Sequence, residues 1–117
     1  MGRLTTHVLD TSRGMPAAGL TVELYRLDGG GRSLVKTLVT NKDGRADAPL
    51  LEGAALTRGQ FELVFAAADY FRAAGVALTD PPFLDVVPVR FSIADPAQHY
   101  HVPLLVSPYG YTTYRGS

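Results

Sequence analysis

The sequence predicts an all-β fold, a two-sheet antiparallel β-sandwich with one short α-helix. Most of the chain alternates apolar and polar residues with a period of two, which is typical of half-buried strands. Segments rich in glycine, proline and aspartate separate these runs at nearly regular intervals, as the turns of a sandwich do. At 117 residues, the chain is expected to form a single domain, residues 1–117, around one core.

Seven strands and one helix are expected. The strands, in chain order, are residues 4–10, 21–27, 33–41, 59–67, 86–93, 98–107 and 109–114. In two of them the apolar side chains that share the core face are evident from the alternation: Phe61, Leu63 and Phe65 in one, and Val87, Val89, Phe91 and Ile93 in the other. The helix is expected at about residues 68–76, where helix-forming residues carry apolar side chains at helical spacing and Gly75 can cap the end.

The composition excludes several classes of function. Eleven basic and eleven acidic side chains balance, so nothing attracts nucleic acid or an anionic membrane surface. The chain has no cysteine and therefore no disulfide, thiolate nucleophile or cysteine-ligated zinc. The N-terminal residues enter an alternating pattern at once and lack the apolar core of a signal peptide, so a cytoplasmic location is expected.

All three histidines are expected on outward faces of strands. In residues 98–107, His99 and His101 alternate with the apolar positions, and His7 is opposite Leu4 and Val8. Three interpretations remain open: histidines that are solvated or covered by another subunit, a three-histidine zinc site, or general acid-base chemistry near neutral pH. Arg45, which follows an Asp-Gly turn, and Arg115 are either solvated or able to grip oxygens of a planar ligand.

Three motifs together resemble one family. They are LTTHVLD near the start, TNKDGR in the middle and HYHVPLLVSPYGYTTYRGS at the end, and they are similar to the transthyretin-related 5-hydroxyisourate hydrolase family over essentially the whole chain. The terminal Tyr-Arg-Gly-Ser is that family's signature. The resemblance implies a transthyretin-like sandwich and a homotetramer, a dimer of dimers with the active sites in a central channel.

The resemblance also implies the site residues and the reaction. The catalytic residues would be His7, Arg45, His101 and Ser117, and the substrate-binding residues would be His7, Arg45, Tyr114, Arg115 and Gly116. No metal and no other cofactor is implied, and His99 stays outside the site. The reaction would be the hydrolytic opening of 5-hydroxyisourate, in urate catabolism, to 2-oxo-4-hydroxy-4-carboxy-5-ureidoimidazoline.

Ser117 is expected to lie in the channel, where its hydroxyl and carboxylate could hydrogen-bond to a catalytic histidine. Two rival functions are kept. One is a transthyretin-like carrier, which would need an apolar channel. The other is a zinc hydrolase that uses His7, His99 and His101.

Overall fold

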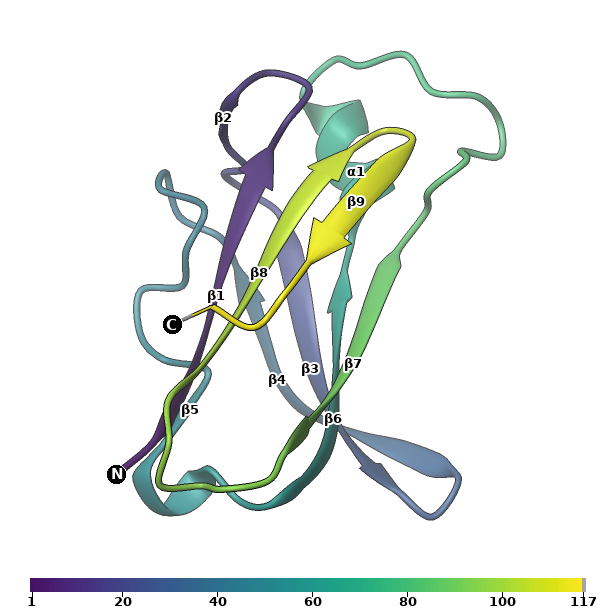
Figure 1. Ribbon diagram of the computed structural model, residues 1–117. Helices are drawn as coiled ribbons and strands as arrows, with labels where there is room; N and C mark the ends of the chain where they lie inside the picture. The colour runs from purple at the N-terminus through teal and green to yellow at the C-terminus, as the bar shows by residue number, and fades with distance from the viewer. Residues whose placement is uncertain (117) are drawn as a thin grey trace.

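The protein, described here by a computed structural model of residues 1–116, is a sandwich of two β-sheets with one α-helix (Figure 1). One sheet has the strand order β2-β1-β8-β9, with β5 also paired to β1, and the other has the order β4-β3-β6-β7. The strands are β1 (Arg3–Asp10), β2 (Met15–Pro16), β3 (Thr21–Asp28), β4 (Gly31–Val39), β5 (Leu51–Glu52), β6 (Gly59–Phe65), β7 (Val87–Ile93), β8 (Tyr100–Ser107) and β9 (Gly110–Thr113). The two-sheet sandwich with one short helix is therefore confirmed.

The core lies between the two sheets, and the alternation in the sequence identifies the side chains that fill it. Phe61, Leu63 and Phe65 of β6 are fully buried, as are Leu4 and Val8 of β1. The inward face of β8 is buried too, at Tyr100, Val102, Leu104 and Val106. Because a strand turns successive side chains to opposite faces, these positions leave His7 and His101 on the outer face of their sheet.

One strand pair differs from the antiparallel arrangement that the sequence predicts. β1 and β8 run parallel, with Leu4 opposite Tyr100 and Asp10 opposite Val106, whereas the other pairs are antiparallel. Parallel neighbours need a long connection, and here the whole second sheet lies between them in sequence. Period-two alternation is the same for both directions, so the sequence pattern could not reveal this pair.

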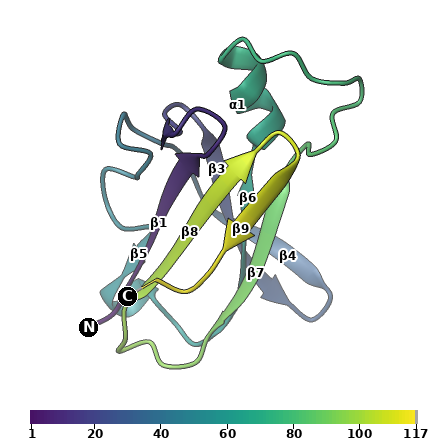
Figure 2. The same cartoon turned by 45° about the horizontal axis from the view of Figure 1, so that its top comes forward.

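The helix α1 (Ala67–Ala73) lies at one end of the sandwich (Figure 2). It ends as the sequence predicts, at Gly75, whose φ of 84° is favoured only for glycine. The Gly75 amide donates to the Arg72 carbonyl and the Val76 amide to the Phe71 carbonyl, which is the Schellman pattern. No helix within residues 1–116 is long and apolar enough to cross a membrane.

Some predicted boundaries are wrong by about two residues, and one of them matters for the site. β8 begins at Tyr100, so His99 precedes the strand instead of lying within it. A turn occupies this stretch, because the Gln98 amide donates to the Asp95 carbonyl and the Ala97 amide to the Asp95 carboxylate. The short strands β2 and β5 and the 3-10 turn η1 (Gly53–Ala55) were not predicted.

Candidate active site

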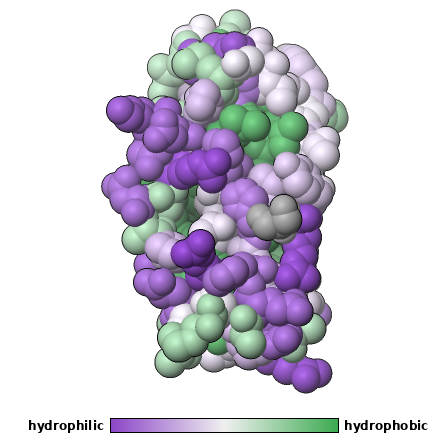
Figure 3. Space-filling model, turned by 60° about the vertical axis from the view of Figure 1, so that its left-hand side comes forward, coloured by the Kyte–Doolittle hydropathy of each residue, from purple (hydrophilic) through white to green (hydrophobic). Residues whose placement is uncertain are grey.

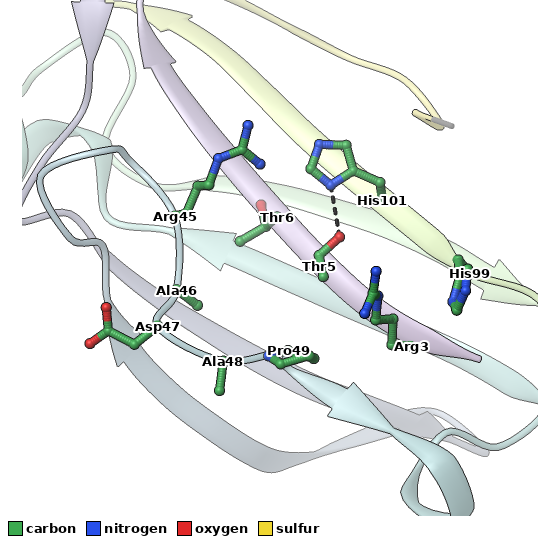
Figure 4. Close-up of a pocket in the computed structure, with 10 residues that line it drawn as sticks. All are labelled: Arg3, Thr5, Thr6, Arg45, Ala46, Asp47, Ala48, Pro49, His99 and His101. Atoms are coloured by element: carbon green, nitrogen blue, oxygen red, sulfur yellow. Dashed lines mark hydrogen bonds between the residues drawn. The ribbon is translucent and has the colours of Figure 1, made fainter. Parts of the chain in front are cut away.

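A cavity of about 530 Å³ opens on the outer face of the β1 and β8 pair. Strands β1 and β8 form one wall, and the loop that precedes β5 forms the other (Figure 4). The lining residues are Arg3, Thr5, Thr6, Arg45, Ala46, Asp47, Ala48, Pro49, His99 and His101. The parallel pairing therefore brings the N-terminal and C-terminal motifs to one place, although 96 positions separate Thr5 from His101.

Arg45 reaches the cavity through a tight turn. The Asn41 side-chain oxygen accepts hydrogen bonds from the backbone amides of Asp43 and Arg45. The backbone amide of Asn41 in turn donates to the Arg45 carbonyl. Gly44 has a φ of 75°, and a Cβ there would lie 2.3 Å from the Val8 carbonyl oxygen, so only glycine fits. The Asn-Lys-Asp-Gly-Arg sequence thus builds a turn that packs against β1 and directs Arg45 toward the cavity.

Hydrogen bonds from His7 and its neighbour Val8 tie this turn to β1. The Nε2 of His7 lies 2.9 Å from the Asp43 carbonyl oxygen, which can only accept, so Nε2 carries the proton and donates. The Val8 amide donates to the Gly44 carbonyl, and His7 forms an antiparallel bridge with Arg45. His7 is not among the residues that line the cavity, so within one chain it lies beside Arg45 and supports it.

His101 lies in the wall of the cavity and has two partners. Its Nδ1 lies 2.8 Å from the Thr5 hydroxyl oxygen, and its carbonyl accepts a 2.7 Å hydrogen bond from the Gly116 amide. The second ring nitrogen points toward the Arg45 guanidinium (Figure 4). Thr5 shares the outward face of β1 with His7, but its pairing with His101 depends on the parallel register, so the sequence analysis missed it as a site residue.

Both histidines are disposed to be neutral at pH 7. Burial is the main cause that lowers the pKa of His101 below 6.5, and the positive charge of Arg45 and the neighbouring His7 lower it further. Burial and Arg45 also lower the pKa of His7, against an opposing contribution from its hydrogen bond to Asp43. A neutral imidazole beside a permanent cation can accept a proton and faces a group that stabilises negative charge.

The face that carries β1 is largely hydrophilic, with the most hydrophobic residues in a patch in the upper half of the view and weaker hydrophobic ones at its left and bottom (Figure 3). The cavity lining agrees with this, since Arg3, Arg45, His99 and His101 carry or can carry positive charge and Asp47 alone is acidic. His99, which the sequence analysis left outside the site, is thus part of the wall. Such a lining suits a small polar or anionic molecule more than an apolar one.

Tyr114 and Arg115 do not join this cavity within one chain. They line a second, more apolar groove of about 330 Å³ with residues of β7 and β8. The Arg115 guanidinium donates to the Gln98 side chain and the His99 carbonyl and lies 4.1 Å from the centre of the Tyr100 ring. Gly116 does contact His101, and Ser117 is outside the described residues.

Within one chain, the three histidines are not gathered in the way that the rival zinc site requires. In the described part of the chain, no group of three or more histidine, cysteine, aspartate or glutamate side chains is arranged to hold a metal ion. His7 already uses Nε2 in a hydrogen bond to the Asp43 carbonyl, and His101 uses Nδ1 in a hydrogen bond with the Thr5 hydroxyl.

Comparison with known proteins gives close relatives over the full length. The chain is 66% identical to "5-hydroxyisourate hydrolase 2" of Rhizobium meliloti, covering 99% of this chain and 97% of that protein. It is 42% identical to the 5-hydroxyisourate hydrolase of Mus musculus, covering 97% and 94% of the two chains.

Solved structures also match this chain over nearly its full length. A 5-hydroxyisourate hydrolase from Klebsiella pneumoniae matches with a TM-score of 0.82 and 36% identity over 100% of both chains. Sea bream transthyretin in complex with thyroxine matches with a TM-score of 0.87 and 27% identity, covering 97% of this chain and 94% of that one. An (S)-allantoin synthase matches with a TM-score of 0.94 and 48% identity over 99% of this chain, which spans 44% of the synthase. The family model described as "Transthyretin: HIUase/Transthyretin family" matches residues 4–116, and the chain belongs to that family.

Proposed function

We propose that this protein hydrolyses 5-hydroxyisourate to 2-oxo-4-hydroxy-4-carboxy-5-ureidoimidazoline in urate catabolism. The observation that carries the proposal is the meeting of His101 and Arg45, from distant parts of the chain, at one polar cavity, with His7 behind Arg45. The names of the relatives identify the ring that such a site would open.

The proposed mechanism is water attack on a ring carbonyl, followed by cleavage of the adjacent carbon-nitrogen bond. His101, neutral at pH 7, takes a proton from the attacking water. The Arg45 guanidinium binds the ring oxygens and stabilises the negative charge that develops on the carbonyl oxygen. His101, protonated by the first step, then returns the proton to the leaving nitrogen.

In this proposal His7 orients Arg45, because its Nε2–H is already committed to the Asp43 carbonyl. Tyr114, Arg115, Gly116 and Ser117 are retained as proposed members of the site. Gly116 would act through its backbone hydrogen bond to the His101 carbonyl.

We also propose that the active assembly is a homotetramer in which two dimers face each other across the cavities. The cavity is open on the outer face of β1 and β8, and a second copy facing it would shield the substrate and the attacking water from bulk solvent. A cytoplasmic location stays a prediction from the N-terminal sequence.

A thyroxine-type carrier is the weaker candidate. Arginine, threonine and histidine side chains make the cavity polar, whereas a carrier of apolar ligands needs an apolar lining. The identity to sea bream transthyretin is also lower, at 27%, than the 66% identity to the bacterial hydrolase.

The test is spectroscopic. Urate oxidase generates 5-hydroxyisourate in the cuvette, and the decay of its absorbance is followed with and without the protein. The wild type is expected to accelerate the decay. His101→Asn, which cannot act as a base, is expected to lose a factor of about 10² to 10⁴ in rate while remaining folded. The proposal is wrong if the wild type leaves the decay unchanged.

A further inference from the structure

Within residues 1–116, the Thr5 hydroxyl is the only side-chain group that forms a hydrogen bond with the His101 ring. The hydroxyl oxygen lies 2.8 Å from Nδ1, and the two residues are direct partners across β1 and β8. Both belong to regular strands, so the contact is held by the backbone ladder of the sheet. With Nδ1 held in this way, the other nitrogen, Nε2, is directed toward the cavity and the Arg45 guanidinium (Figure 4).

The surroundings of the ring decide which nitrogen carries the proton. A guanidinium has only N–H donors and a fixed positive charge, so it favours a lone pair on the nitrogen that faces it and disfavours an N–H there. A threonine hydroxyl can accept as well as donate, so it accommodates a proton on Nδ1. The Thr5 hydroxyl hydrogen can then point into the cavity, which Thr5 lines.

We propose that Thr5 is a positioning residue that accepts the Nδ1–H of His101 and thereby keeps the Nε2 lone pair facing the cavity. This inference rests on the proposed function, because it says how His101 is prepared to take a proton from water. It goes further in assigning the protonated nitrogen and the residue that enforces it. In water, a free neutral histidine side chain favours the opposite form, with the proton on Nε2, and that form would turn a donor toward Arg45.

Other charged groups surround the ring, and the proposal must hold in their presence. The charges of Arg45 and His7 act on it, and Arg3 of β1, Asp47 of the loop before β5 and His99 of the turn before β8 line the same cavity. Of these, Arg45 is the one toward which Nε2 points. None of them makes a hydrogen bond to either ring nitrogen among the described residues, so the hydroxyl of Thr5 has no competitor for Nδ1.

The experiment compares three variants with the wild type. Thr5→Val keeps the β-branched shape and removes the hydroxyl. Thr5→Ser restores it. Thr11→Val is the matched control, because it also removes a threonine hydroxyl that hydrogen-bonds to β8, here by donating to the Val106 carbonyl, and Thr11 does not line the cavity. For each protein, kcat and KM for 5-hydroxyisourate are measured, and the His101 tautomer is read from ¹⁵N chemical shifts above the pKa of the ring.

The wild type is expected to show His101 with the proton on Nδ1. Thr5→Val should shift the population toward Nε2–H and lower kcat by about 10-fold to 100-fold, the range seen when a metal-bound histidine loses the partner that orients it, with KM little changed. Thr5→Ser should restore both readouts, and Thr11→Val should alter neither.

Three results would overturn the proposal: Nε2–H as the main form in the wild type, an unchanged tautomer in Thr5→Val, or an unchanged kcat in that variant. If Thr5→Val does not fold, the wild-type and Thr5→Ser spectra still decide which nitrogen is protonated. If the wild type does not accelerate decay at all, the proposed function fails, while the ¹⁵N shifts still judge the tautomer on their own.

Discussion

Gly116→Ala tests how closely the C-terminal motif and His101 depend on one another. A Cβ built on Gly116 would lie 2.6 Å from Cδ2 of the His101 ring and 3.3 Å from its Cβ and Cγ. Ordinary carbon contacts begin at about 3.4 Å, so the ring or the backbone near Gly116 must move by roughly 0.8 Å. The Gly116 amide is also tied to the His101 carbonyl, which limits how far the backbone can yield.

A displacement of this size at a catalytic group is costly. Misplacing a reacting group by about 1 Å can lower a rate by about 100-fold, so we expect kcat of Gly116→Ala to fall by about that factor. The assay is the decay of 5-hydroxyisourate made in place by urate oxidase. The thermal midpoint should change little, because Gly116 lies outside the core between the sheets.

Gly110→Ala is the matched control for this experiment. Gly110 lies in the same hairpin arm, and a Cβ there would meet only the Ser107 hydroxyl, at 3.9 Å. Its activity should equal that of the wild type. Wild-type activity in Gly116→Ala as well would refute the reasoning, because it would mean that the precise place of the His101 ring does not matter for turnover.

Two further predictions concern charge. The acid limb of the kcat/KM profile should lie below pH 6.5, because burial and then Arg45 lower the pKa of His101, so that its base form persists as the pH falls. Arg45→Ala should move that limb to higher pH and lower kcat by about 100-fold. An acid limb that stays in place in Arg45→Ala would contradict this pairing. Glu62→Gln should lower the free energy of unfolding by about 1–2 kcal/mol in urea denaturation, because the buried Glu62 carboxylate accepts hydrogen bonds from Arg32 and Arg90, and it should leave kcat unchanged.

Much of the fold could be predicted from the sequence because burial imposes a period of two on each strand. The inward positions of β8 and β6 follow from alternation alone, and Gly75 marks the end of the helix. Strand direction and partner could not be predicted in this way, since alternation records which face is buried and not which strand lies alongside. The parallel pair of β1 and β8, on which the cavity depends, is of that kind.

The candidate site was predicted in part for the same reason. Alternation predicts that His7 and His101 point outward, and the Asp-Gly turn before Arg45 marks that residue as a candidate. The sequence shows Thr5 only as a neighbour of His7 on one face, because its role depends on the register that places it opposite His101. The contribution of His99 to the cavity wall depends on the turn that ends before Tyr100, which the strand pattern obscured.

Alternation also explains why the C-terminal motif does not act as one patch. Gly116 lies against the outward-facing His101, whereas the Arg115 guanidinium lies over the ring of the inward-facing Tyr100, so consecutive residues serve opposite sides of β8. Arg115 also bonds to the carbonyl of His99, and His99 forms part of the cavity wall. Within one chain, Arg115 can therefore influence the cavity only through the backbone to which it hydrogen-bonds. For Arg115 to contact the substrate directly, the groove of one copy of the chain would have to face the cavity of another copy.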